Sequence, residues 1–205
     1  HTIDDLTTAL RDPDPCVSVS AADALRSIGA GAEVAIHELA SIAKDPSQNL
    51  YLRRTSILAL RSIGAEPVLD DLRKLLEDKD FGIRSNAAGA LLSLGYQAQK
   101  AIPDLEKTIK DYEENWYGQV REDAIEALGA IELDLIKEIS KGSRGKIENN
   151  DINAVSTLRD VLVSDPAWRV RKQATEQLGK IAEEAQKNKP VYDSLRDSLN
   201  ATVPS

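Results

Sequence analysis

Few side chains in this 205-residue sequence have the type and spacing that chemistry requires. The pair His37-Glu38 could contribute to a metal site, but His1 is the only other histidine, and one such pair cannot close a metal site. Cys16 is the single cysteine, and no histidine near it in the sequence could activate it as a nucleophile. We therefore interpret Cys16 as a small turn residue and expect no catalytic residue, no metal site and no cofactor.

Residues 141–146, KGSRGK, have a faint likeness to a phosphate-binding loop. The pattern G-x-x-x-x-G-K-[S/T] requires a glycine where Ser140 stands and a hydroxyl residue where Ile147 stands. Both requirements fail, so we interpret the stretch as a loop that a partner could contact.

Arginines and aspartates recur at matched places along the chain. A planar guanidinium group suits bidentate, partly buried contacts with carboxylates. We expect each arginine to pair with an aspartate of the same or an adjacent copy of the pattern, and a basic stripe for an anionic ligand is the alternative. The arginines are Arg53, Arg84, Arg121 and Arg171, with Ser18 at the first place, and the aspartates are Asp12, Asp45, Asp78, Asp111 and Asp165.

The arginines belong to a longer pattern, V-R-x-x-A-x-x-A-L-x-x-I-G, which occurs five times. Apolar residues fall at i, i+4, i+7, i+8 and i+11, as on one face of an amphipathic helix. The copies span 17–29, 52–64, 83–95, 120–132 and 170–182, and ALRSIGA stands at both 24–30 and 59–65. Gly29, Gly64 and Gly95 close three copies, where a left-handed residue would end the helix.

A shorter helical pattern that ends in aspartate precedes each copy, so each repeat is predicted to be two helices, A and B, joined by a turn. One hairpin buries too little apolar surface to fold alone, whereas stacked hairpins share a continuous core. The predicted fold is an all-α solenoid, a right-handed superhelix of about five hairpins in a single domain, 1–205. The expected repeats are 2–31, 32–66, 67–97, 98–133 and 150–185, with a partial sixth at 189–205 and an insertion at 134–151.

The turn aspartate, the apolar-arginine pair that opens the B helix, its Ala-Leu centre and its Ile-Gly end resemble HEAT repeats. The resemblance is specifically to the short phycobilisome-lyase-like subclass, and it extends over nearly the whole chain. It implies that the B helices line the concave side of the solenoid. Deoxyhypusine hydroxylase, a HEAT-like di-iron enzyme, uses several His-Glu pairs, whereas this chain has one. Because HEAT repeats serve many roles, the resemblance implies no single function.

Composition and charge narrow the classes of function. With 41% hydrophobic and 29% charged residues, the sequence is typical of a globular protein. A formal charge of −8 repels phosphate backbones, so we expect no binding to nucleic acid, and a HEAT-like DNA glycosylase is disfavoured. No apolar run is long enough to span a membrane, and neither a signal-peptide pattern nor a set of cysteines is present. We expect a cytoplasmic protein.

The predicted function is a non-enzymatic scaffold that binds another protein on the concave face of the B helices. Residues 101–140 carry 11 acidic against 4 basic side chains, which suggests a partner with a basic segment. The expected contacts are Val19, Arg54, Leu58, Arg61 and Leu92, flanked by the aromatic residues Tyr51, Phe81, Trp116, Tyr117 and Trp168. These aromatics could equally pack between neighbouring turns. The alternative function, implied only by the resemblance, is a bilin lyase-type enzyme or accessory subunit that acts on phycobiliproteins.

Overall fold

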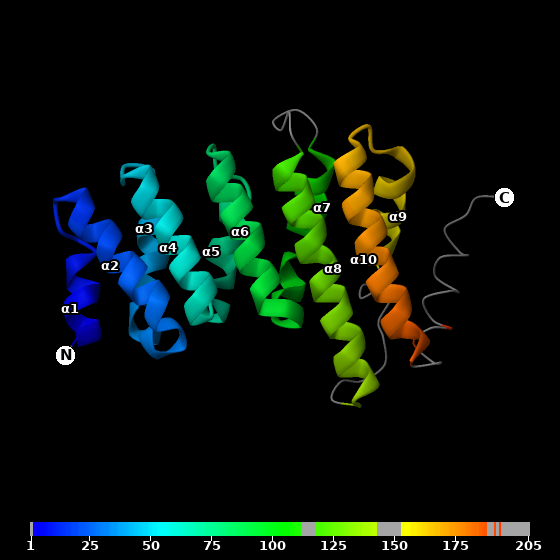
Figure 1. Cartoon of the computed structure of the whole chain (residues 1–205), viewed down its shortest axis with the longest axis horizontal. Coiled ribbons are helices and arrows are strands. Elements are labelled where there is room, and N and C mark those ends of the chain that lie inside the picture. The colour runs from blue at the N-terminus through cyan, green and yellow to red at the C-terminus, as the bar shows by residue number, and fades with distance from the viewer. Residues whose placement is uncertain (1, 112–117, 143–152, 188–190, 192, 194–205) are drawn as a thin grey trace. The chain divides into compact units, whose positions relative to one another are not determined.

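The computed structural model describes residues 2–111, 118–142, 153–187, 191 and 193, and every regular element within these ranges is a helix (Figure 1). The predicted all-α solenoid of paired helices is confirmed. The chain divides into two compact units, His1–Leu94 and Gly95–Ser205, which are described one at a time.

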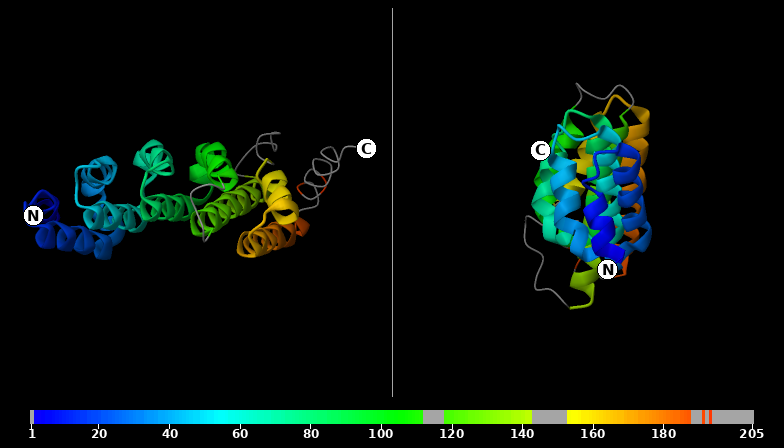
Figure 2. Two further views of the ribbon diagram at one scale, coloured as in Figure 1. Left: turned by 90° about the horizontal axis from the view of Figure 1, so that it is seen from above. Right: turned by 90° about the vertical axis from the view of Figure 1, so that its left-hand side faces the viewer.

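The first unit contains three A–B hairpins. Each A helix packs against the B helix that follows it, and the B helices pack side by side, α2 against α4 and α4 against α6 (Figure 2). The A helices are α1 (Thr2–Ala9), α3 (Ile36–Lys44) and α5 (Leu69–Leu75), and the B helices are α2 (Pro15–Ile28), α4 (Leu50–Ile63) and α6 (Phe81–Leu94). The 3-10 segments η1 (Gly29–Ala35) and η2 (Glu66–Val68) connect consecutive hairpins.

The described residues of the second unit contain two hairpins. It begins with the 3-10 segment η3 (Gly95–Ala101), followed by α7 (Ile102–Lys110), α8 (Gln119–Ser140), α9 (Asn153–Ser164) and α10 (Trp168–Gln186). Helix α7 packs on α8, α9 packs on α10, and the two B helices α8 and α10 pack against each other. Of the expected sixth A helix at 189–205 only Val191 and Asp193 are described, and residues 143–151 of the expected insertion lie outside the described residues.

One helix is longer than predicted. The insertion was expected to begin at residue 134, whereas α8 continues to Ser140 without a break. The physical reason is the residue that closes the pattern. Gly29, Gly64 and Gly95 have positive φ, which confirms that they end their helices, but Glu132 stands at this place in the fourth copy. No residue there favours leaving the helical conformation, so the helix goes on.

The core follows the predicted stripe and extends beyond it. The positions i, i+4, i+7, i+8 and i+11 of the B helices are mostly buried, with Val17 and Ile28 of α2 as exposed exceptions. Position i+5 is buried as well, at Ala22, Ile57, Ala88 and Ile125. A B helix contacts both its own A helix and the neighbouring B helix, so its apolar stripe must be wider than that of a helix packed on one side.

No helix within the described part of the chain combines the length and the apolar character needed to cross a membrane.

Candidate partner-binding surface and charged turns

The aspartates of the A–B turns share one backbone contact. In four turns the Oδ1 atom accepts a hydrogen bond from the amide nitrogen two residues further on, which closes an Asx turn. The four bonds run to Asp12 from Asp14 (2.8 Å), to Asp45 from Ser47 (2.9 Å), to Asp78 from Asp80 (2.9 Å) and to Asp165 from Ala167 (2.8 Å). Because the turn itself uses Oδ1, the second carboxylate oxygen is left for a group from another helix.

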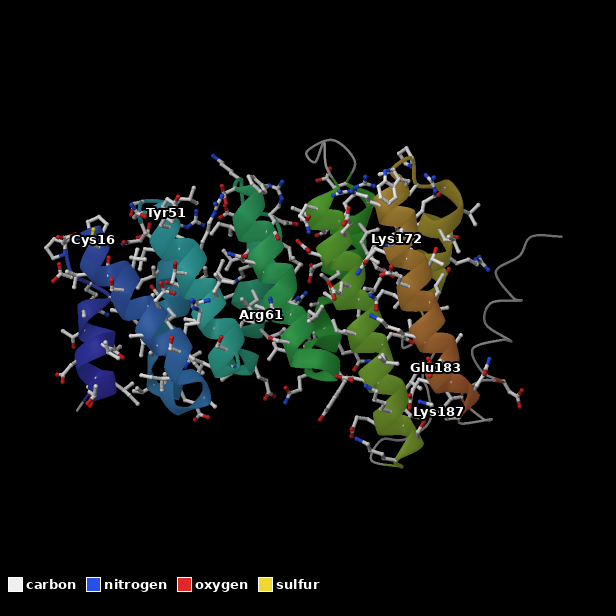
Figure 3. The ribbon with its side chains drawn as sticks, viewed as in Figure 1. Cys16, Tyr51, Arg61, Lys172, Glu183 and Lys187 are labelled. Atoms are coloured by element: carbon white, nitrogen blue, oxygen red, sulfur yellow. The ribbon has the colours of Figure 1, made fainter. Side chains whose placement is uncertain are left out.

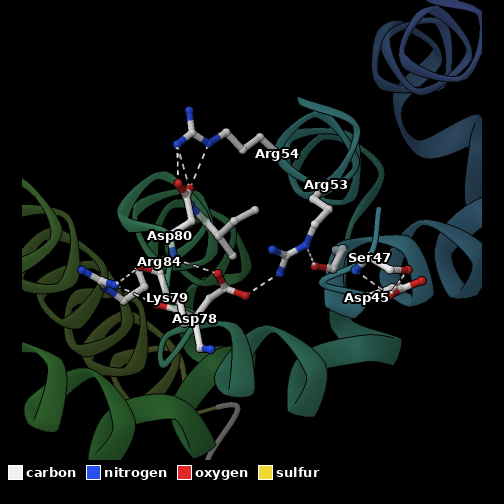
Figure 4. Close-up of polar contacts among 10 residues, drawn as sticks. Asp45, Ser47, Arg53, Arg54, Asp78, Lys79, Asp80 and Arg84 are labelled. Carbon is white, nitrogen blue, oxygen red and sulfur yellow. Dashed lines mark hydrogen bonds and ion pairs between the residues drawn. The ribbon is translucent and has the colours of Figure 1, made fainter. Parts of the chain in front are cut away.

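In two turns that group is an arginine of the preceding repeat. Nη2 of Arg53 donates to Oδ2 of Asp78 (Figure 4). Nη1 of Arg121 donates to Oδ2 of Asp165. All four side chains are largely buried, and that of Asp165 is 0% exposed. We call such a pair, in which the B-helix arginine of one repeat binds the turn aspartate of the next, a rung.

A second arginine holds each of these turns from its own hairpin. Nη1 of Arg84 donates to the main-chain oxygens of Asp78 (2.7 Å) and Lys79 (3.2 Å). Arg171 does the same at Asp165 (2.7 Å) and Pro166 (3.0 Å). These contacts favour the structural interpretation of the arginines over an anion-binding stripe. The remaining predicted partner, Asp111, is exposed at the end of α7, next to residues outside the described range.

At the first turn pair the rung is incomplete. Ser18 stands where the later repeats have arginine, and it is buried, with its hydroxyl 3.4 Å from the main-chain oxygens of Asp14 and Pro15. A cavity of about 520 Å³ opens beside it, between the α1–α2 and α3–α4 turns. We call this cavity the open rung. Its lining includes Leu10, Asp12, Ser18, Glu38, Asp45 and Leu52.

A further arginine, Arg54, is fixed at the α4–α6 contact. Its guanidinium donates to Asp80 through Nε (3.0 Å to Oδ1) and Nη2 (2.7 Å to Oδ2), and it lies 5.4 Å from the ring centroid of Phe81. A Cβ atom at residue 82 would lie 2.6 Å from this guanidinium, so Gly82 leaves the room that Arg54 occupies. Burial alone would raise the pKa of Asp80, but hydrogen bonds from Arg54 and from the Ile83 amide outweigh it and lower that pKa below its ordinary value.

The residues expected to bind a partner divide into two groups. Val19, Leu58 and Leu92 are half-buried, although the sequence pattern indicated that they are exposed. Arg61 is exposed and lies along α4, where Figure 3 labels it. Its guanidinium approaches the space above Gly89 on the adjacent α6, 3.2 Å from where a Cβ would stand.

Three of the aromatic residues are strongly exposed. Tyr51 and Phe81 stand at the first turns of α4 and α6, and their exposed fractions are 74% and 57%. In the second unit, Trp168 is 63% exposed at the start of α10, with Arg169 5.7 Å from its ring. These fractions favour a binding rim over packing between turns. Trp116 and Tyr117 lie outside the described residues.

The side chains whose types are suited to chemistry, His37 and Cys16, stand apart from each other. His37 and Cys16 are both exposed, and no group of three potential metal ligands forms among the residues that the structure describes. Glu38 pairs instead with Arg11 of the preceding hairpin, at 2.7 and 2.6 Å. Sequence reasoning missed the Arg11–Glu38 and Arg54–Asp80 pairs, since neither recurs at matched places in the other repeats.

This arrangement of helices is similar to that of known helical repeat proteins. Residues 38–129 match the model of the HEAT repeats family. The complex of CpcE and CpcF of phycocyanin lyase from Nostoc sp. PCC7120 is similar in fold, with 22% identity and a TM-score of 0.62 over 86% of this chain and 97% of that chain. A designed armadillo repeat protein in complex with the peptide (KR)4 is 18% identical, with a TM-score of 0.62 over 98% of this chain and 91% of the other. Among curated proteins, none matches this sequence significantly.

The fold and the charged turns therefore define a helical repeat protein. More particularly, residues 38–129 are similar to HEAT repeats, and the likeness of the chain to the phycocyanin lyase complex is one of fold.

Proposed function

We propose that this protein is a scaffold that binds another polypeptide on the exposed face of the B helices in its first unit. This B-helix face consists of Val19, Arg54, Leu58, Arg61 and Leu92, with Tyr51 and Phe81 at its edge. The observation that carries the proposal is the exposure of Tyr51 and Phe81 on adjacent helices. A surface that only meets water does not require large aromatic side chains, whereas interfaces are enriched in tyrosine, phenylalanine and arginine.

The fixed position of Arg54 supports the same surface. Its ion pair with Asp80 and its contact with Phe81 hold the side chain in one place, so little conformational entropy remains to be lost when a partner binds. Leu58 and Leu92 are half-buried and would form an apolar floor between the charged groups. An aromatic edge, an ordered arginine and an apolar floor together are typical of binding hot spots.

The partner is proposed to present a basic segment. Residues 101–140 hold an excess of acidic side chains, which would attract such a segment and speed its association. A designed armadillo repeat protein of similar fold is found in complex with the peptide (KR)4, so this architecture is compatible with such a ligand.

Affinity capture with matched variants tests the B-helix face. Wild-type protein and the double variants Tyr51→Ala/Phe81→Ala and Leu58→Glu/Leu92→Glu are used as baits, and bound proteins are quantified by mass spectrometry. We expect both variants to lose at least about tenfold of the partner that wild type enriches, because hot-spot side chains carry most of the binding free energy. Val34→Glu is the control, since Val34 is an apolar residue, 63% exposed, on η1. Capture that survives both double variants, with their melting curves intact, would contradict the proposal.

The lyase-type alternative rests on the fold likeness to the CpcE and CpcF complex. A different measurement distinguishes it from the scaffold function. A linear tetrapyrrole is mixed with the purified protein, and its visible absorption is recorded. A shifted and intensified band that is retained through gel filtration would favour the alternative, whereas an unchanged spectrum favours the scaffold.

A further inference from the structure

The open rung has lost a cation that the same structure places at the equivalent position elsewhere. Arg53 and Arg121 fill this position at two later turns and bind the Oδ2 atoms of Asp78 and Asp165. Ser18 cannot replace them, because its short side chain reaches only the main chain of its own turn. The space that an arginine side chain would take is left as a cavity of about 520 Å³, within the range of ligand pockets.

The carboxylate of the open rung keeps the geometry of its occupied counterparts. Oδ1 of Asp45 accepts from the Ser47 amide, as Oδ1 of Asp78 accepts from Asp80. Its Oδ2 accepts only a 3.2 Å bond from Gln48, a neutral and exposed side chain, where Asp78 receives a guanidinium. The hydrogen bonds from Ser47 lower the pKa of Asp45, so its carboxylate is ionised at neutral pH.

The rest of the lining favours an arginine side chain over other cations. The lining includes three acidic residues, Asp12, Glu38 and Asp45, and one basic residue, Arg11, so it has a formal net charge of −2. Arg11 is already engaged with Glu38 at 2.7 and 2.6 Å. Leu10, Ile42 and Leu52 add apolar wall, which suits the methylene stem of an arginine. A hard metal ion would require several converging oxygens, and no such group is found among the described residues.

We propose that the open rung is a binding site for a guanidinium group, supplied by an arginine side chain of a partner polypeptide that completes the rung with Asp45. The incoming side chain takes the place that Arg53 takes at Asp78, with its stem along the apolar wall and its planar head on the carboxylate. This site lies at the turns and is independent of the B-helix face proposed above, so either site can exist without the other.

The test uses small probes whose only variable is the head group. Nα-acetyl-arginine amide, Nα-acetyl-lysine amide and Nα-acetyl-citrulline amide are titrated into the wild-type protein, and amide shifts of Ser18, Asp45 and Asn49 are followed by NMR. We expect the arginine probe to bind with a dissociation constant on the order of a millimolar, as for a ligand of few atoms. The citrulline probe has the same shape without the charge and is expected not to bind. Equal binding of arginine and citrulline probes, or no binding of any probe, overturns the proposal.

Variants identify the site. Ser18→Arg supplies the guanidinium from within the chain and is expected to abolish probe binding, while Asp45→Asn is expected to weaken it at least tenfold. Arg53→Ser opens a second, matched cavity at Asp78, so this variant is expected to bind two equivalents of the arginine probe. If Ser18→Arg fails to fold, Asp45→Asn still tests whether the probe binds at Asp45. Unchanged binding in Asp45→Asn places the probe elsewhere and overturns the site.

One more comparison decides whether the guanidinium comes from a polypeptide or from a small guanidino compound. Free arginine, Nα-acetyl-arginine amide and the tripeptide acetyl-Gly-Arg-Gly-amide are ranked by affinity. A polypeptide partner predicts that the tripeptide binds at least as tightly as the single residue and that free arginine binds most weakly. Tightest binding by free arginine would assign the site to a small guanidino compound and overturn the polypeptide part of the proposal.

Discussion

The turns at Asp45 and Asp78 lie in the same unit and close the same Asx turn, yet only one of them is bound by an arginine of the preceding repeat. At Asp78 the guanidinium of Arg53 fills the space between the hairpins, whereas at Asp45 the buried Ser18 leaves a cavity. The backbone of the turn is therefore formed by local hydrogen bonds and does not depend on the arginine. The arginine instead ties the B helix of one repeat to the turn of the next.

The two turns also differ in what water can reach. The ion pair at Asp78 is largely buried, so each charge depends on the other for the interactions that water would otherwise supply. Asp45 lines the open rung, and its carboxylate accepts hydrogen bonds from the neutral residues Ser47 and Gln48. Removal of Arg53 from the rung at Asp78 is therefore expected to cost stability, whereas Asp45 is already accommodated without an arginine. The following experiments separate these two cases.

The largest effect is expected in the second unit, at the most buried rung. Arg121→Ser leaves the carboxylate of Asp165, which is 0% exposed, without its cation. We expect a loss of about 3–5 kcal/mol in the free energy of unfolding, as measured for broken buried ion pairs, by urea denaturation. The matched control is Arg26→Ser, which removes an exposed i, i+3 pair with Asp23 and should cost less than about 0.5 kcal/mol. Comparable losses in both variants would show that the rung is not special.

A smaller loss is expected at the complete rung of the first unit. Arg53→Ser turns the Asp78 site into a copy of the open rung, but water can reach Asp78 in part, because its side chain is 15% exposed. We expect about 2–3 kcal/mol of destabilisation in urea. Adding Asp78→Asn to this variant removes the unpaired charge and should recover part of the loss. A double variant that is less stable than Arg53→Ser would contradict the account.

The reverse change is expected to stabilise. Ser18→Arg completes the open rung and should raise the melting temperature by roughly 2–4 °C, measured by circular dichroism. Because the gain comes from the carboxylate of Asp45, it should disappear when Asp45→Asn is combined with Ser18→Arg. An equal gain in both backgrounds would mean that the arginine stem, and not the ion pair, stabilises the fold.

The smallest effects are in acid titration. The pKa of Asp80 lies below its ordinary value because Arg54 and the Ile83 amide outweigh the effect of burial, whereas the pKa of Asp45 is lowered by Ser47. A carboxyl group whose folded-state pKa is depressed stabilises the fold above its unfolded pKa of about 3.9, and this stability is lost as pH falls through the folded-state value. Arg54→Gln should therefore raise the pKa of Asp80, followed by carboxyl NMR, and reduce the stability lost below about pH 4. Asp45 serves as the internal reference and should not move.

Much of the fold could be predicted from the sequence because its determinants are local. The helical period predicted the paired helices, and the closing glycines predicted three helix ends, where φ is positive in the structure. The absence of such a glycine at Glu132 could have predicted the continuation of α8, but the spacing of 50 residues between the copies that begin at 120 and 170 was attributed to an insertion at 134–151. Period alone predicts which side of a helix points away from its hairpin partner.

The candidate sites were less accessible, because they depend on contacts between repeats. Leu58 and Leu92 are half-buried, since neighbouring B helices cover the flanks of the face that period analysis treats as open. Residue type predicted that each arginine pairs with a turn aspartate, but it could not decide between the turn of the same repeat and that of the next repeat. The open rung could not be predicted because its position depends on this choice of turn. The serine at position 18, where later repeats have arginine, was nevertheless a sequence feature that indicated it.

The rung also gives the array a direction. Each described rung runs from an arginine in one hairpin to an aspartate in the following one. A hairpin therefore donates through its B-helix arginine to the next hairpin and accepts through its turn aspartate from the previous one. Whether a junction is filled is therefore decided by the earlier hairpin alone. Were the segment 2–31 placed ahead of another hairpin with the same turn, the vacancy would travel with it, and a binding cavity could be moved along a repeat protein by reordering its modules.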